Sequence, residues 1–176
     1  MKRTIWMMML LLALTACGKM GKDGRVKQNV NWSDWYYDDV DGSASKPGLM
    51  IMSFNVRYGS ASEDTGDKAW TNRREGCYAM INTLQPVLMG VQECQKTQRN
   101  DLMANCPDYL SVGRSRDNTD NGEQMAIFYK PDSVAVEDWG TFWLTDTPDQ
   151  VSKHPMAGHY RCATWAKVRH LKTSTE

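Results

Sequence analysis

The 176-residue chain balances 21 lysine and arginine residues against 21 aspartate and glutamate residues, so its formal net charge is zero. Without Lys2 and Arg3 at its start, 19 basic residues face 21 acidic ones, which gives a formal net charge of −2. A protein that binds long nucleic acid through phosphate neutralisation is usually basic. The composition therefore argues against long DNA or RNA as the ligand.

The first 16 residues have the pattern of an export signal. Lys2 and Arg3 precede an apolar run from residue 5 to residue 14, and Ala16 stands directly before Cys17. A charged start, a short apolar stretch and a small residue before the cleavage point are typical of a secretory signal peptide. A transmembrane anchor is the alternative, but the run is far shorter than the roughly 20 residues needed to cross a bilayer. We therefore expect residues 1–16 to be a signal peptide.

Residues 14–17, Leu-Thr-Ala-Cys, resemble the lipobox of bacterial lipoproteins. The resemblance implies that Cys17 receives the lipid and becomes the new N-terminus. Stable anchoring takes more than one acyl chain, which a multiply acylated cysteine supplies. Gly18 and Lys19 follow in place of an acidic run that would direct the protein to the cell surface. We expect an exported lipoprotein, anchored in a membrane by Cys17 and located on its periplasmic face.

The segment after the lipidated cysteine is polar and contains glycine, with no sustained helical or strand period up to about residue 47. Residues 17–48 are therefore predicted to be the lipidated cysteine and a flexible linker, followed by a domain over residues 49–176.

Four further cysteines lie in the exported part: Cys77, Cys94, Cys106 and Cys162. They show no CxxC spacing and have no paired histidines nearby, which argues against a zinc site. An oxidising periplasm permits disulfides, but buried free thiols fit the same sequence. The sequence leaves both alternatives open.

The domain is predicted to begin with a buried strand, a helix and a second strand. An apolar run over residues 49–56 meets polar Asn55 at its end, and a second run over residues 87–93 ends on Glu93 in the same way. Between them, residues 70–84 carry apolar side chains at helical spacing. These side chains are Trp70, Cys77, Ile81 and Leu84. A helix between two strands makes the strands parallel.

Parallel strands place Asn55 and Glu93 at the same edge of the sheet. Ligands in α/β folds collect at the carboxyl ends of such strands. This edge is therefore the predicted site.

A second helix is expected over residues 95–105, followed by several short strands with an antiparallel arrangement. These strands are predicted at residues 109–113, 124–130, 133–139, 141–144 and 160–168. The Lys130-Pro131-Asp132-Ser133 step between two of them is typical of a tight turn. Four aromatic residues of these strands are expected in the core rather than on a base-stacking surface. They are Trp139, Phe142, Trp143 and Trp165.

Three stretches in this order resemble the endonuclease/exonuclease/phosphatase superfamily. They are SFNVRYG at residues 53–59, GVQE at residues 90–93, and the run from GRSRDNTDNGEQMAIFYK through GTFWLTDTP to RCATWAKV at residues 113–168. The resemblance covers roughly residues 49–169. It implies magnesium-dependent cleavage of phosphodiesters or phosphomonoesters, and an α/β fold that is part of a four-layered sandwich, with two mixed β-sheets flanked by helices.

The same resemblance implies roles for four residues. Glu93 and Asn55 would belong to a metal site, in which Glu93 binds Mg²⁺, or Mn²⁺ in its place, and Asn55 orients the phosphate or the water shell of the ion. Hard oxygen ligands of this kind suit magnesium. Arg116 and Arg161 match arginines of the family and would hold the substrate phosphate, which pairs well with guanidinium groups. A solvated or structural arginine is the alternative for each.

Motifs that the family carries in its second half do not occur in this sequence: a histidine in an Asn-Thr-His-Leu-Asp-His-like stretch, Gly-Asp-Phe-Asn, and a terminal Ser-Asp-His. His154, His159 and His170 stand in other contexts, so no catalytic residue is assigned. We expect the C-terminal half of the domain to be missing from residues 49–176. A complementing C-terminal half would complete the enzyme.

The resemblance implies a phosphate-ester small molecule or a nucleotide as the substrate. Sugar phosphates and phospholipid head groups are included, because fold alone does not choose among them. A catalytically inactive fragment, or a binding lipoprotein derived from this fold, is the alternative function.

Overall fold

The computed structural model describes residues 49–119 and 121–171. The predicted signal peptide, residues 1–16, and the predicted linker with Cys17, residues 17–48, lie outside the described residues. Within the described ranges, no helix is long and apolar enough to cross a membrane.

The described residues form two sheets and two α-helices, which confirms the α/β fold class. The elements in chain order are β1 (Ile51–Asn55), the 3-10 helix η2 (Gly66–Lys68), α1 (Trp70–Leu84), β2 (Leu88–Gln95), α2 (Lys96–Asn105), β3 (Leu110–Val112), β4 (Glu123–Tyr129), β5 (Val134–Trp143) and β6 (Cys162–His170). The main sheet has the strand order β1-β2-β4-β3, and β5 and β6 form a second sheet, here called the hairpin sheet.

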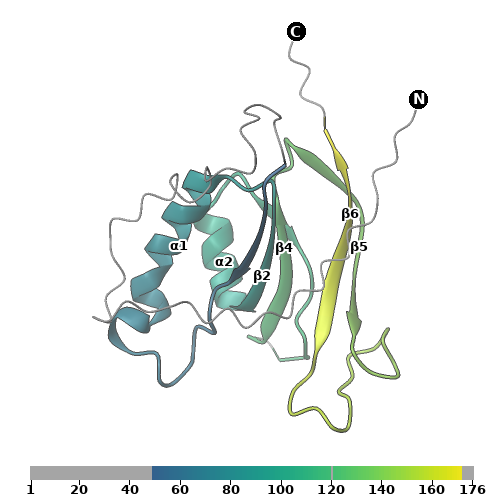
Figure 1. The fold of residues 1–176 in the computed structure, drawn as a ribbon. Coiled ribbons are helices and arrows are strands. Elements are labelled where there is room, and N and C mark those ends of the chain that lie inside the picture. Colours follow the sequence, from purple (N-terminus) through teal and green to yellow (C-terminus); the bar gives the residue numbers. More distant parts are fainter. Residues whose placement is uncertain (1–48, 120, 172–176) are drawn as a thin grey trace, which may run out of the picture.

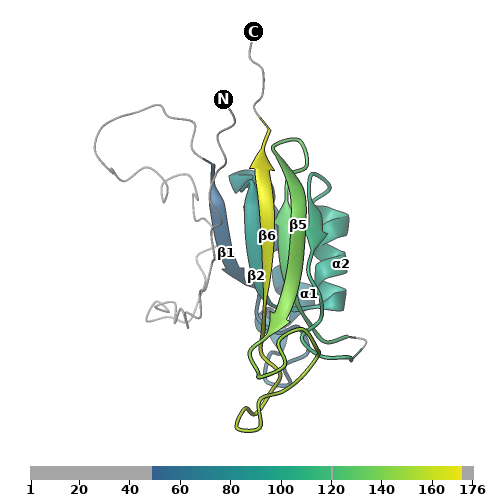
Figure 2. The ribbon, with the colours of Figure 1, turned by 90° about the vertical axis from the view of Figure 1, so that its right-hand side faces the viewer.

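The elements are arranged in three layers. Figure 1 shows α1 and α2 on one face of the main sheet and the hairpin sheet on the other. Figure 2, turned by 90°, shows β5 and β6 facing the viewer with the helices on the far side of the main sheet. A fourth layer would be formed by helices outside the hairpin sheet, and the part of the chain that the structure describes contains no helix there.

The predicted parallel unit at the start of the domain is confirmed. β1 pairs with β2 in parallel, from Ile51 opposite Leu88 to Asn55 opposite Gln92. The helix between them spans Trp70–Leu84, the predicted range. Its apolar residue Ile81 is fully buried against the sheet, together with Leu102 of α2 and Phe128 of β4. The two helices therefore fix the position of the main sheet through one continuous core.

β1 differs from the prediction of a buried strand, because it lies at an edge of the main sheet and buries one face. Met52 is buried, whereas Ile51 and Ser53 are exposed. Successive side chains of a strand point to opposite faces, so the alternation follows from the covering of a single face.

The strands after α2 are antiparallel to their neighbours, as predicted. The turn before β5 is also confirmed, since the Ser133 N–H donates to the Lys130 carbonyl at 3.1 Å. The two strands predicted at residues 133–139 and 141–144 are one continuous strand, β5. Gly140 lies inside this strand, opposite Trp165. A Cβ at this glycine would lie 2.9 Å from Trp165 Nε1, so the missing side chain makes room for the indole.

The prediction of four core aromatic residues holds for Trp143, which is fully buried, and Phe142 is partly buried. It is wrong for Trp139 and Trp165, which are 40% and 39% exposed. Trp139 pairs with Ala166 and Trp165 pairs with Gly140, so the two indoles lie on opposite faces of the hairpin sheet. The strand pattern alone does not reveal which face of a sheet is covered.

The structure decides between the two alternatives for the cysteines. All four described cysteines are free thiols. Burial raises the pKa of the Cys94 thiol from its ordinary value of 9.0 to about 12, and it raises the pKa values of Cys106 and Cys162 to about 11. Such thiols are inert packing groups rather than nucleophiles.

These thiols make the stability of the domain depend on alkaline pH. Thiols of the unfolded chain ionise near pH 9, whereas the buried thiols keep their protons to higher pH, so the stabilisation is complete below about pH 9 and is lost as the pH rises toward about 12. The free energy of unfolding in urea, measured under reducing conditions on the Cys17→Ser chain, should fall between about pH 8 and pH 11. Cys94→Ala should make this fall of the unfolding free energy with pH less steep. An unchanged pH dependence in this variant would contradict the contribution of the buried Cys94 thiol.

Candidate functional site

The structure brings Asn55 and Glu93 together at the end of the two parallel strands. Asn55 is the last residue of β1, and its Nδ2 donates a hydrogen bond to Glu93 Oε1 at 2.9 Å. Asn55 is exposed and Glu93 is half-buried. Both side chains are therefore accessible from solvent at the sheet edge that the sequence predicts as the site.

A β-bulge in β2 turns Glu93 toward β1. Val91 pairs with Ala126 of β4, but Cys94 pairs with Gln124, so β2 has one residue more than its partner in this interval. Glu93 lies in the bulge with φ 56, in the left-handed region. A bulge re-aims side chains and is frequent beside active sites. The left-handed conformation of a residue other than glycine costs about 1–3 kcal/mol and persists only where the surroundings enforce it.

Backbone N–H groups after β1 donate further hydrogen bonds to these two side chains. The Tyr58 N–H donates to Glu93 Oε2 at 3.1 Å, and the Arg57 N–H donates to Asn55 Oδ1 at 2.8 Å. Arg57 also has a left-handed backbone, with φ 59. Two of the three described non-glycine residues with positive φ thus belong to this one site. Each Glu93 oxygen accepts one hydrogen bond from the protein.

Arg116, a predicted phosphate ligand, is held by neighbouring carboxylates. Its Nη1 lies 2.7 Å from Glu123 Oε2, and its Nε lies 3.9 Å from Asp117 Oδ2. The side chain of Arg116 is 17% exposed and that of Glu123 is 13% exposed. The Arg116 carbonyl accepts a hydrogen bond at 2.7 Å from the indole of buried Trp143, which ties the hairpin sheet to this segment. Arg116 therefore has a structural role, which is independent of any contact with a substrate phosphate.

Glu123 connects this ion pair to Glu93 electrostatically. Burial raises the pKa of Glu123, the charge of Arg116 opposes the rise, and the negative charge of Glu93 adds to it. Arg161 also acts on Glu123, in the same direction as Arg116. The two carboxylates and the two arginines thus lie at the same end of the domain.

Arg161, the second predicted phosphate ligand, has a guanidinium group without a bonding partner among the described residues. It is exposed, and across residues 49–119 and 121–171 its side chain takes part in no hydrogen bond or ion pair. It precedes β6, and its carbonyl accepts from the Leu144 N–H at 2.8 Å. Its guanidinium can therefore reach a bound anion without first breaking a contact.

The donor set at this edge fits a magnesium ion in part. Glu93 offers a carboxylate whose two oxygens keep lone pairs beyond the two bonds that they accept. Magnesium commonly takes one or two carboxylates and completes its shell with water and substrate oxygens. No group of three or more histidine, cysteine, aspartate or glutamate side chains that could hold a metal ion occurs in the described part of the chain. Glu93 is thus a possible first ligand rather than a complete site.

No protein-family model and no curated protein matches this sequence. Solved structures do match. An endonuclease/exonuclease/phosphatase from Bacteroides vulgatus is 33% identical with a TM-score of 0.62, over 67% of this chain and 45% of that one. A family protein from Bacteroides thetaiotaomicron is 32% identical with a TM-score of 0.66, over 71% and 46%. A mannosyl-6-phosphatase from the same organism is 31% identical with a TM-score of 0.66, over 70% and 46%.

This chain belongs to the endonuclease/exonuclease/phosphatase family. The family resemblance seen in the sequence is therefore confirmed. The chain spans a little less than half the length of the three solved family structures described above.

The sequence analysis missed two residues that lie beside Asn55, Glu93 and Arg116 in the structure. Glu123 lies within the quoted GEQMAIFYK stretch, seven residues after Arg116, and an acidic residue that opens an alternating strand is a usable signal for an ion pair. Gln98 is fully buried in α2, one turn before the buried Leu102. A polar residue on the apolar face of a helix indicates a buried hydrogen-bond network, which fixes local structure.

The different surroundings of the two arginines predict different effects of substitution. Arg116→Met leaves Glu123 buried without its partner and should lower the free energy of unfolding by about 2 kcal/mol. Arg161→Met, the matched control at an exposed position, should change it by less than about 0.5 kcal/mol. Urea denaturation of the two variants measures both values, and equal losses would contradict the structural role of Arg116.

Proposed function

We propose that this chain provides the metal-binding edge of a phosphoesterase of the endonuclease/exonuclease/phosphatase type. The observation that carries the proposal is the Asn55–Glu93 hydrogen bond at the carboxyl ends of two parallel strands, where this class of fold binds ligands. The similarity to family structures at 31–33% identity supports it.

Glu93 would be the carboxylate ligand of Mg²⁺, or of Mn²⁺ in its place. Asn55 and the Tyr58 N–H would orient that carboxylate, since each donates to one of its oxygens. When bound, the ion would act as a Lewis acid on a phosphoryl oxygen. Groups that surround a metal ligand usually orient it through hydrogen bonds of this kind.

Arg161 would hold the substrate phosphate, because its guanidinium is exposed and unpaired within the described ranges. Arg116 would shape the site through the ion pair between its Nη1 and Glu123. It would contact the phosphate with guanidinium N–H groups that do not take part in this ion pair. The groups that activate water and protonate the leaving oxygen are proposed to come from polypeptide outside the described residues. A complementing C-terminal half is the partner in this proposal.

The proposed substrate is a small phosphate ester, such as a sugar phosphate, a phospholipid head group or a nucleotide. One matched structure at 31% identity is a mannosyl-6-phosphatase, which favours the sugar phosphates among these. Long nucleic acid is not proposed, because removal of the predicted signal leaves 19 basic against 21 acidic residues.

The chain is further proposed to be a periplasmic lipoprotein anchored through Cys17. The support is the charged start, the short apolar run and the Leu-Thr-Ala-Cys sequence.

The anchoring proposal predicts that Cys17 carries the lipid. Expressed in a bacterium fed with labelled fatty acid, the chain should carry the label and sediment with membranes. Cys17→Ala should carry none, with Cys77→Ala as the control that stays labelled. Label retained in Cys17→Ala would contradict the anchor.

The metal proposal predicts binding without turnover by the chain alone. The purified chain should bind Mn²⁺, measured by electron paramagnetic resonance, and Glu93→Ala should abolish this binding because it removes the carboxylate ligand. Glu75→Ala, which removes an exposed carboxylate of α1, is the matched control. Hydrolysis of an aryl phosphate monoester or diester with Mg²⁺ should not exceed that of Glu93→Ala.

Hydrolysis that depends on Glu93 would show that the chain holds a complete active site. Absence of Mn²⁺ binding by the unsubstituted chain would favour an inactive remnant or a binding lipoprotein.

A further inference from the structure

The turn that follows β1 supplies the hydrogen bonds that orient the proposed metal ligand. Its Tyr58 N–H donates to Glu93, and its Arg57 N–H donates to Asn55. The turn has the left-handed Arg57 in its middle, so its own backbone preference does not favour this shape. Contacts from outside the turn must therefore hold it.

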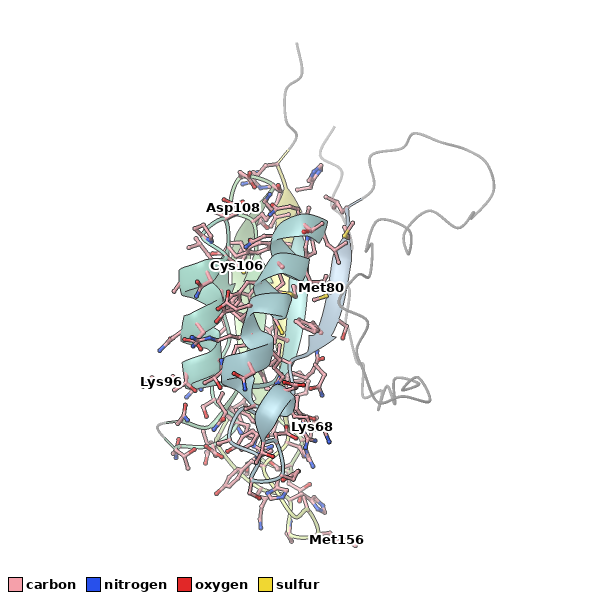
Figure 3. All side chains as sticks on the ribbon, turned by 90° about the vertical axis from the view of Figure 1, so that its left-hand side faces the viewer. Lys68, Met80, Lys96, Cys106, Asp108 and Met156 are labelled. Atoms are coloured by element: carbon pink, nitrogen blue, oxygen red, sulfur yellow. The ribbon has the colours of Figure 1, made fainter. Side chains whose placement is uncertain are left out.

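The two helices provide these contacts through one side chain each. Arg73 of α1 donates to the carbonyls of Val56 and Arg57, the latter at 2.7 Å. Gln98 of α2 donates from Nε2 to the same Arg57 carbonyl at 2.9 Å. Figure 3 shows the two helices side by side over the sheet, with Lys68 and Lys96 marking the ends at which α1 and α2 begin. Both helices thus begin at the end of the sheet where the site lies.

Gln98 joins the turn to the strand that carries Glu93. Its Oε1 accepts from the Gly59 N–H at 3.0 Å and from the Gln95 N–H at 2.9 Å, and Gln95 is the last residue of β2. Gln98 has no exposed surface. A buried amide with partners on both its oxygen and its nitrogen rigidifies the backbone that it bonds. One side chain therefore fixes the turn after β1 relative to the end of β2.

Gly59 is the point at which this bridge needs a glycine. A Cβ at Gly59 would lie 2.8 Å from Gln98 Cδ and 3.0 Å from Gln98 Oε1. Such distances are too short for side-chain contacts, so any larger residue would displace the Gln98 amide. The close approach of the Gly59 backbone is thus a condition of the hydrogen bond that it makes.

We propose that Gln98 is a positioning residue for the metal site: it sets the direction of the Glu93 carboxylate by holding the turn that bonds it. The inference rests on the proposed function, since it presumes that Glu93 binds a metal ion. Gln98 does not touch the ion or the substrate. Its effect passes through the Arg57 carbonyl and the Gly59 N–H to the Tyr58 N–H, and from there to Glu93.

The test is Mn²⁺ binding by the purified full-length chain, followed by electron paramagnetic resonance with Mn²⁺ as the only added ligand. Gln98→Met keeps the size of the side chain and removes all three hydrogen bonds. Gly59→Ala keeps residue 98 as glutamine, but the added methyl group displaces the side-chain amide of Gln98. Loss of groups that orient a metal ligand typically weakens metal binding by roughly 10–100-fold, so each variant should bind Mn²⁺ at least about tenfold more weakly.

The matched control is Gly158→Ala, because a Cβ at Gly158 meets no atom within 4 Å. It should bind Mn²⁺ like the unsubstituted chain. Gly59→Ala displaces a buried amide, so it should unfold in urea at a lower midpoint than Gly158→Ala, and both variants should be folded without urea, where Mn²⁺ binding is measured. Hydrogen exchange of the Tyr58 amide gives a readout without metal, and it should become faster in Gly59→Ala than in the control.

The outcomes separate this inference from the function beneath it. Weaker Mn²⁺ binding and faster Tyr58 exchange in Gly59→Ala support the positioning role, and they do so even where Gln98→Met fails to fold. Binding by Gly59→Ala equal to that of Gly158→Ala overturns the positioning role and leaves the metal site standing. An unsubstituted chain that binds no Mn²⁺ overturns the metal site and the inference together.

Discussion

The hydrogen bond between Asn55 and Glu93 is the contact on which the site depends, and the bulge in β2 makes it possible. In a regular strand, Gln92 lies opposite Asn55 and the side chains alternate from there. The extra residue of the bulge and the left-handed backbone of Glu93 break this alternation and turn the carboxylate toward β1. The conformational cost of about 1–3 kcal/mol is offset by bonds from Asn55 and Tyr58 to the two carboxylate oxygens.

The core and the site are linked through a few polar side chains that cross between layers. The helices pack on the main sheet through an apolar core that includes Ile81, Leu102 and Phe128. From the same helices, Gln98 reaches the turn beside Glu93. On the other face, the indole of Trp143 ties the hairpin sheet to Arg116. Each layer thus holds one part of the site.

The elements and the place of the site could be predicted from the sequence, because they follow from local periodicity and a general rule of topology. Apolar spacing between Trp70 and Leu84 defines a helix, and its two flanking strands must then be parallel, which brings Asn55 and Glu93 to one edge. The bulge could not be predicted, since no glycine marks it. The partner of Arg116 and the bridge made by Gln98 depend on side chains that meet only in the folded chain. The exposure of Trp139 and Trp165 depends on how far the neighbouring layers extend over the two faces of the hairpin sheet.

The central claim is that Glu93 binds a divalent cation at this sheet edge. The most direct measurement is an anomalous difference map from a crystal of the chain soaked in Mn²⁺. We expect a peak within coordination distance of the Glu93 carboxylate, close to Asn55, with water molecules in the other positions of the ion. A map with Mn²⁺ bound at other carboxylates and no density beside an accessible Glu93 would contradict it.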